Sequence, residues 1–309
     1  IAPILSIMRL AKNQNTKEGA TLMLLQNDSF ENTQNAFYQA VKTLQITKLL
    51  HMSNVRKSCG KPVGKVFQFL VLLVFQGENL FRFLNSKHVA QAGAQKNTFY
   101  RFMDEPSYNW KRFLLLLAAK VINALRPLTN TGRVKVFILD DSTIPRNRSK
   151  KVELLARIFD HVSHKFVKGF TLLTLGWSDG YSFIPLTFNL LSSAKKSNRY
   201  QEISASIDHR TNGYKARLES MLHKPDAALR LIKSALDIGI SADYVLMDTW
   251  FTTEPFIKSI QDLGLDVIGM VKQLNQSYIF HGKTYKLAQL QKSAPYKSAK
   301  ECFGSLVVY

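Results

Sequence analysis

The chain has 309 residues, of which 46% are hydrophobic and 21% are charged, a composition typical of a soluble globular protein and not of a disordered one. Its formal net charge of +20 indicates a polyanionic partner, most often nucleic acid, although a generally basic, solvated surface is the plain alternative. Two cysteines exclude a disulfide framework and a zinc ribbon, and they favour a reduced, cytosolic setting. The longest apolar run, residues 66–75, is too short to cross a membrane, and the first residues lack the features of a signal peptide.

The first part of the sequence divides into a polar segment and a helical one. Residues 1–30 are weakly patterned, and we expect a loosely ordered arm there. Residues 31–130 carry helical periodicity, with Pro62 near one helix start, and predict a small helical domain. Its basic side chains could contact DNA, as a helix-turn-helix or otherwise, or they could be the solvated face of a supporting bundle. In its last helix we expect one apolar face made of Phe113, Leu116, Leu117 and Val121.

The most informative stretch runs from Val134 to Thr143 and reads as a short buried strand. It is rich in β-branched and aromatic residues and is bounded by Gly132 before and Pro145 after, which favours a strand over a helix. The strand delivers Asp140 and Asp141 at its carboxyl end. Carboxylates in such a position are costly unless they bind a cation or a partner. These two residues are therefore the first functional candidates.

The pattern after this stretch is strand–strand–strand–helix–strand–helix–strand. The turn Ser178-Asp179-Gly180 separates two apolar runs and predicts a hairpin, and Gly239 is a plausible helix stop. We expect strands at residues 170–176, 181–191, 244–247 and 266–271, helices at 225–236 and 254–263, and hairpin material after residue 278. This alternation predicts an α/β fold, with a mixed sheet flanked by helices, over residues 131–309.

Two of the expected strands end in an aspartate that hydroxyl residues follow: Asp141 in the first and Asp248 in the other. In an α/β sheet, strands of the same direction bring their carboxyl ends to the same edge. Two carboxylates there repel each other unless a divalent cation lies between them, and oxygen ligands suit Mg²⁺ or Mn²⁺. A pair of such ions, about 4 Å apart, can activate a water or a 3′-hydroxyl for phosphodiester chemistry. Taken singly, each aspartate could instead be an ordinary turn or N-cap residue.

Three longer segments carry a resemblance to a known family. They are VFILDDSTIPRNRSKKVELLARIFDHV, KGFTLLTLGWSDGYSFIPLTFNLLSS and YVLMDTWFT, in this order. From about Lys96 to Gln291 the sequence resembles the IS4-type DDE transposases of bacterial insertion sequences. The resemblance implies an RNase H-like catalytic domain, preceded here by the helical domain, that cuts and joins DNA with two metal ions held by Asp, Asp and Glu.

The resemblance also implies roles for individual residues. The first aspartate of the family lies in a D-x-T pattern at the end of the first strand, which Asp141 and Thr143 match. Asp140 is the second choice for this role. The second aspartate of the family matches Asp248. The resemblance thus assigns Asp141 and Asp248 as catalytic metal ligands for Mg²⁺ or Mn²⁺.

The third acid of the family should be a glutamate on a later helix, among Tyr, Arg and Lys. Glu254 follows Asp248 too closely, and Glu301 precedes a strand-like apolar run. The chain begins with Ile1 and not with Met, and it stops within that apolar run at Tyr309. We therefore expect a C-terminally truncated chain whose catalytic domain is incomplete and whose activity is lost without the missing glutamate.

Basic residues follow both the first aspartate and the third strand. Each could bind a DNA phosphate without reading sequence, or could belong to a solvated face. Trp250 could stack on a displaced base, although such an aromatic residue more often packs under a site. The candidate DNA-binding residues are Arg146, Arg148, Lys150, Lys151, Arg157, Lys195, Lys196 and Arg199.

The sequence as a whole predicts a transposase that cleaves DNA at the ends of an insertion sequence and transfers the strands. Its partner would be double-stranded DNA, on which it would form a homo-oligomer, and its location would be the bacterial cytoplasm at the nucleoid, with no membrane association. The alternative from another class is a truncated, non-catalytic DNA-binding remnant or inhibitor of transposition. A third possibility is an RNase H-like nuclease that cleaves DNA without strand transfer.

Overall fold

A computed structural model of the chain describes residues 35–128, 132–271, 275, 277–293, 297–299 and 302–305. The arm expected at residues 1–30 lies outside these ranges. None of the helices within them combines the length and the apolar character that crossing a bilayer requires.

The N-terminal part is helical, as predicted. Its helices begin at residues that suit a helix start. Pro62 precedes α4, the Asn79 side chain accepts a hydrogen bond from the backbone N–H of Phe81, and the Asn109 side chain accepts one from that of Arg112. Aromatic residues fill its core, as where Phe67 packs edge-on to Phe113. After a helical segment at residues 35–43, the elements are α3 (Ile46–Met52), α4 (Val63–Phe75), α5 (Leu80–Leu84), η2 (Val89–Ala92), α6 (Lys96–Asp104), α7 (Trp110–Leu125) and η3 (Arg126–Leu128).

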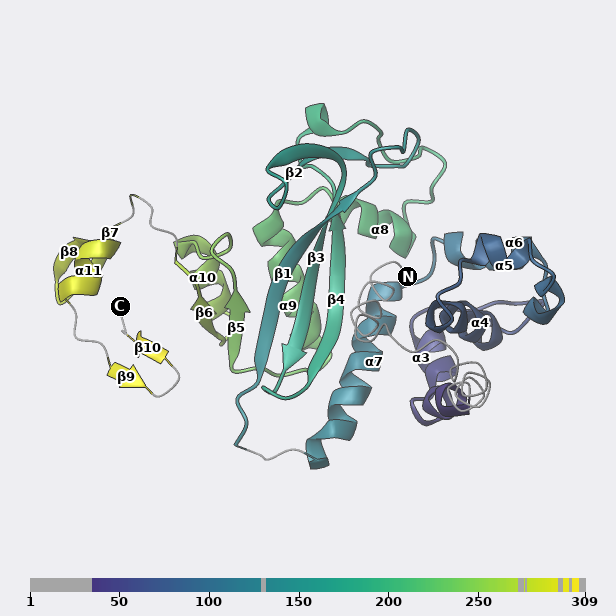
Figure 1. Cartoon of the computed structure of the whole chain (residues 1–309), viewed down its shortest axis with the longest axis horizontal. Helices are drawn as coiled ribbons and strands as arrows, with labels where there is room; N and C mark the ends of the chain where they lie inside the picture. The colour runs from purple at the N-terminus through teal and green to yellow at the C-terminus, as the bar shows by residue number, and fades with distance from the viewer. Residues whose placement is uncertain are drawn as a thin grey trace, which may run out of the picture.

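Helix α7 belongs to two hydrophobic clusters at once (Figure 1). Phe113, Leu116 and Leu117 pack in the helical part, which confirms most of the face that the sequence predicts. Leu115, Ala118 and Ile122 are buried in the cluster of the sheet. This second face was not expected, because α7 is apolar around most of its circumference and its periodicity does not show which side a sheet would cover.

The centre of the molecule is a six-stranded mixed sheet. Strands β3, β1, β5 and β6 lie side by side in this order, while β2 and β4 pair with β3 on its other side. The β1–β3 and β3–β4 pairs are antiparallel, whereas β5 is parallel to β1 and β6 is parallel to β5. An antiparallel meander extended by two parallel strands is the RNase H-like arrangement. The strands are β1 (Val136–Pro145), β2 (Ala156–Asp160), β3 (Lys165–Ser178), β4 (Phe183–Leu191), β5 (Tyr244–Met247) and β6 (Asp266–Gly269).

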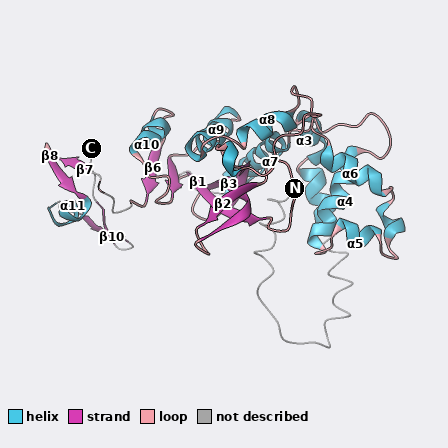
Figure 2. Ribbon diagram, turned by 90° about the horizontal axis from the view of Figure 1, so that it is seen from above, coloured by secondary structure: helices cyan, strands magenta, loops and turns pink. Residues whose placement is uncertain are grey.

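The described helices that pack on the sheet lie on one of its faces (Figure 2). They are α7, α9 (Lys224–Asp237) and α10 (Glu254–Gln261), and α8 (Asn212–Glu219) lies beyond β4. Under them the strands present buried apolar side chains at alternate positions, such as Phe137 and Leu139 of β1. The alternation fixes which side chains of β1 face the helices and which face away.

The strands and helices expected after residue 131 are all present, with two differences. The first strand continues to Pro145, because β3 pairs with it as far as Gly169. Glycine permits this pairing, since a side chain at position 169 would collide with the Ile144 carbonyl oxygen. Strand β2 was not predicted: ARIFD is short, and it pairs with β3 only through a hairpin that local sequence does not indicate. Gly180 has a φ of 87° in the predicted turn before β4.

The last described segments form the expected hairpin and more. Strands β7 (Ser277–Phe280) and β8 (Lys283–Lys286) pair antiparallel around a turn. They are followed by α11 (Leu287–Ser293) and by a second pair, β9 (Lys297–Ala299) and β10 (Cys302–Ser305).

Candidate active site

Two neighbouring parallel strands bring three aspartates to one edge of the sheet. Leu139 of β1 pairs with Met247, the last residue of β5. Asp140 and Asp248 directly follow these two residues, so they are level with each other across the two strands. Asp141 is one residue further along β1. We call Asp140, Asp141 and Asp248 the acidic edge.

Alternation along β1 separates the two adjacent aspartates of the acidic edge. Asp141 lies two residues after the buried Leu139 and therefore faces the helices, whereas Asp140 points to the opposite face. The Asp140 carboxylate accepts a hydrogen bond from the backbone N–H of Asp141 at 2.8 Å. Partial burial raises the pKa of Asp140, and the negative charges of Asp141 and Asp248 raise it further.

Asp141 is held by a lysine from helix α9. The Lys224 ammonium donates to the Asp141 carboxylate at 3.0 Å, and the two side chains are only 15% and 17% exposed. The same ammonium lies 4.0 Å from the centroid of the Trp250 ring. Lys224 therefore connects the end of β1 with the turn that follows β5. The position of Lys224 could not be predicted from local sequence, because its partner lies 83 residues away in the chain.

Asp248 sits in an ordered turn. Its carboxylate accepts from the backbone N–H of Trp250 at 3.0 Å, and its carbonyl oxygen accepts from the Thr252 hydroxyl at 2.9 Å. Trp250 packs against the core of the sheet and carries the Lys224 ammonium on its face. Thr143 contacts a different group: its hydroxyl, together with a stronger hydrogen bond from Ser163, lowers the pKa of Asp160.

The donors of the acidic edge fit a hard divalent cation in kind. Carboxylate oxygens are the ligands that Mg²⁺ and Mn²⁺ prefer, and the raised pKa of Asp140 indicates negative charge that Lys224 alone does not balance. Within the described ranges, however, no three carboxylate, imidazole or thiol side chains converge closely enough to hold a metal ion unaided. Glu254 is paired with Lys258 at 2.6 Å, and Glu301 lies outside the described residues.

The basic residues that follow β1 and β4 come together near β2. Ala156 of β2 bridges to Arg199, and the backbone N–H of Tyr200 donates to Leu155. Because β1 continues to Pro145, Arg146 lies six residues beyond Asp140, which is roughly 20 Å along an extended strand. The basic group is thus further from the acidic edge than the sequence suggested. Five of its members are exposed, and their side chains make no ion pair, hydrogen bond or ring contact within the described residues: Arg148, Lys150, Lys151, Lys195 and Lys196.

The remaining three candidate DNA-binding residues make contacts within the chain. The Arg199 side chain is 9% exposed, and its guanidinium donates to Glu202 and to the carbonyl oxygens of Ser193 and Ala194. The Arg157 guanidinium lies 3.8 Å from the centroid of the Phe166 ring. Arg146 donates to the carbonyl oxygen of Pro145 at 3.3 Å.

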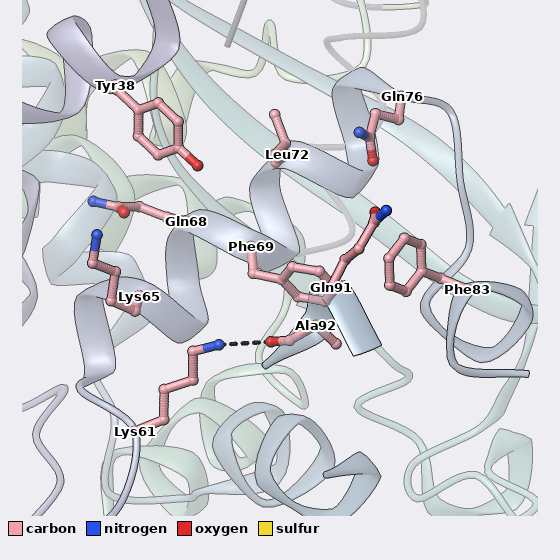
Figure 3. Close-up of a pocket in the computed structure, with 10 residues that line it drawn as sticks. All are labelled: Tyr38, Lys61, Lys65, Gln68, Phe69, Leu72, Gln76, Phe83, Gln91 and Ala92. Carbon is pink, nitrogen blue, oxygen red and sulfur yellow. Dashed lines mark hydrogen bonds between the residues drawn. The ribbon is translucent and has the colours of Figure 1, made fainter. Parts of the chain in front are cut away.

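A separate basic groove lies on the helical part of the molecule. Two adjoining cavities, of about 240 and 440 Å³, share Tyr38, Lys65 and Gln68 (Figure 3 shows the first). Their lining, all of it within the described residues, contains no carboxylate. The Gln68 side-chain oxygen is buried there without a hydrogen-bond partner. We call this the lysine groove, after Lys42, Lys48, Lys61 and Lys65.

A search of curated proteins finds no match. Among solved structures, the Drosophila P element transposase in a strand transfer complex is similar at 8% identity and a TM-score of 0.31, over 84% of this chain and 55% of that one. The piggyBac transposase in a synaptic complex with hairpin DNA is similar at 14% identity and a TM-score of 0.30, over 89% of this chain and 47% of that one.

The chain thus spans about half the length of these two transposases. The family model that describes a DDE superfamily endonuclease matches residues 84–289, well over half of the chain. The matched residues include all six strands of the sheet and the whole acidic edge. The chain belongs to the DDE superfamily of endonucleases.

Proposed function

We propose that this chain is a transposase that cuts and joins DNA at the ends of an insertion sequence, with Asp141 and Asp248 as metal ligands and Asp140 as the alternative to Asp141. The observation that carries the proposal is the meeting of these carboxylates at one edge of the sheet, in a chain of the DDE endonuclease family. Bound Mg²⁺ or Mn²⁺, in two ions, would supply charge stabilisation at the phosphate and an activated hydroxyl nucleophile.

The residues of the chain have a defined task in this proposal. The acidic edge would hold the cations where the pairing of β1 with β5 ends, so that Asp141 and Asp248 stay in fixed relative positions. The ordered turn at Asp248 would keep its carboxylate from rotating away, since the Trp250 backbone N–H occupies one of its oxygens. Rigid placement of charge before the substrate arrives is what lowers the barrier of phosphoryl transfer.

Two basic surfaces would hold the DNA duplex. The five exposed residues near β2 whose side chains make no contact among the described residues are natural phosphate contacts, whereas Arg199 and Arg157 would act mainly by shaping this surface. The lysine groove would be the second contact, because its ammonium groups face no carboxylate. We also propose assembly of two or more copies on DNA and a relationship to the IS4-type transposases, on the resemblance of the sequence.

Replacing Asp248 with Ala tests the catalytic part. We expect DNA cleavage in Mg²⁺ or Mn²⁺ to fall by at least about a hundredfold, because one carboxylate of the metal site is lost, while DNA affinity stays within about twofold. Cleavage is measured by the conversion of supercoiled plasmid to nicked circles. The matched control is Asp262→Ala, which removes an exposed aspartate from the end of α10. Retained nicking with lost DNA binding would overturn the assignment of Asp248.

The alternative function is a DNA-binding protein without catalysis. It is favoured by the observation that, among the described residues, no three carboxylate, imidazole or thiol side chains converge closely enough to hold a metal ion. Such a protein would bind DNA with a strong salt dependence and would nick no plasmid in any divalent cation. A nuclease without transposition would nick the plasmid but would join no donor end to a target.

A further inference from the structure

Lys224 is the one cation that the structure places directly on the acidic edge among the described residues. Its ammonium forms an ion pair with Asp141 at 3.0 Å and lies 4.0 Å from the Trp250 ring centroid and 5.7 Å from that of Phe251. It is the first residue of α9, whose Ala227 and Ala228 are fully buried against the sheet. The backbone that carries Lys224 is therefore fixed, and the long side chain is the movable part.

We propose that Lys224 is a built-in counter-cation that competes with the divalent metal for Asp141. The inference rests on the proposed function, in which Asp141 is a metal ligand. In the metal-free protein, the ammonium neutralises a carboxylate that is largely withdrawn from water and would otherwise stand beside two other negative charges. A divalent cation that binds Asp141 would meet the positive charge of an ammonium that lies 3.0 Å from the same carboxylate, so metal binding favours the departure of Lys224.

The structure also indicates where the ammonium goes. The rings of Trp250 and Phe251, in the turn that carries Asp248, lie 4.0 and 5.7 Å from the ammonium. An aromatic face attracts a cation, so the ammonium can stay at the edge of the site after it releases the carboxylate. Lys224 is thus a positioning residue. Its contact with the Trp250 indole changes when the metal binds Asp141.

The first test measures Mn²⁺ binding by calorimetric titration of the whole chain without DNA. Competition predicts that Lys224→Met binds Mn²⁺ about tenfold more tightly than the wild type, because the repelling charge is gone. Lys233→Met is the matched control: it removes the same charge from an exposed position on the same helix, and its affinity should stay within about twofold of the wild type. Lys224→Arg keeps the cation and should keep the wild-type affinity.

An unchanged or weaker affinity of Lys224→Met relative to Lys233→Met would overturn the proposal, since a residue that only supports Asp141 would lower metal affinity when removed. If the wild type and Lys224→Met both bind no Mn²⁺, the proposed metal site itself is wrong. Mn²⁺ binding by Lys224→Met but not by the wild type would support the competition, since the ammonium would then exclude the metal completely.

The second test uses tryptophan fluorescence and does not depend on the methionine variant folding. Adding Mg²⁺ to the wild type should produce a saturable change in the emission of Trp250, because the ammonium above the ring moves. The change should disappear in Trp250→Phe, which identifies the reporter among the three tryptophans, and in Asp141→Asn, which removes the contested ligand. A change that persists in Asp141→Asn would show that the movement of Lys224 is not coupled to this carboxylate.

Discussion

Single charged residues at the acidic edge reduce the stability of the metal-free protein. Asp140 illustrates this: it is level with Asp248, adjacent to Asp141, and has a raised pKa. Lys224 balances Asp141 directly but makes no hydrogen bond to Asp140. Repulsion that opposes folding in the absence of metal is a common feature of sites that bind cations, because the ligands must be held together before the cation arrives.

Asp140→Asn should therefore stabilise the metal-free protein. The amide oxygen keeps the hydrogen bond from the Asp141 backbone N–H, while the charge is lost. We expect the free energy of unfolding to rise by about 0.5 kcal/mol near neutral pH, a modest value because solvent screens part of the repulsion. Urea denaturation in a chelator measures it. In saturating Mg²⁺ the advantage should vanish, and an advantage of equal size with and without Mg²⁺ would contradict the idea that the cation relieves this charge.

At the scale of elements, the hairpin between β3 and β4 depends on one buried carboxylate. Asp179 is 5% exposed, accepts from the backbone N–H groups of Tyr181 and Ser182 at 3.1 and 2.7 Å, and pairs with Arg133 at 3.0 Å. These contacts favour the ionised form: the Ser182 hydrogen bond has the largest effect in holding the pKa of Asp179 below its usual 3.8. The turn is therefore stabilised by the negative charge of Asp179, which is present only above the pKa of this residue.

Asp179→Asn should lower the free energy of unfolding by about 2 kcal/mol near neutral pH, because the charge-assisted hydrogen bonds become neutral ones. Because the pKa of Asp179 is lower in the folded state, its ionised form stabilises the fold fully above pH 3.8, and this contribution is lost as the pH falls through the folded-state pKa. The difference in free energy of unfolding between the variant and the wild type should therefore shrink below pH 3.8. Urea denaturation across this range checks it, with Asp262→Asn as the control. A difference that does not vary with pH would show that shape, and not charge, matters at this turn.

Elements with a strong local signal were predictable from the sequence, and elements defined by distant contacts were not. Strand β5 matches its prediction because four apolar residues end at an aspartate, and the Asp179 turn was found from its Asp-Gly pair. Strand β2 and the second face of α7 were missed, since both depend on what packs against them from elsewhere in the chain. Asp141 and Asp248 were singled out for the same reason as β5, and the structure brings them to neighbouring strands, while their role as metal ligands stays a prediction. Lys224 was not, because a lysine at a helix start has no distinguishing pattern.

At the scale of the molecule, basic side chains of the described residues gather on more than one surface. One is the basic group near β2, and the other is the lysine groove on the helical part. Two basic residues of α7 are engaged within the chain: Lys111 pairs with Glu219 and Lys120 donates to Gln45. Counter-ions released from DNA on binding would therefore reflect contacts at both surfaces.

Lys48→Gln combined with Lys65→Gln should reduce the salt dependence of DNA binding. Each phosphate contact contributes about 0.9 to the slope of log affinity against log salt concentration, so the slope should fall by about 2. Fluorescence anisotropy of a labelled duplex at several salt concentrations measures it. The control pair is Lys215→Gln with Lys233→Gln, which lie on α8 and α9 outside the lysine groove. An unchanged slope would remove the groove from the DNA contact surface.

The sharing of α7 between two cores has a consequence for how the chain could be divided. A cut at the predicted boundary near residue 131 would leave Phe137, Leu175 and Leu186 without the Leu115, Ala118 and Ile122 side chains beside them. Each half would then expose apolar surface that water does not solvate well. The helical part and the sheet are therefore expected to denature together as one cooperative unit, and neither could be grafted onto another protein unless α7 went with it.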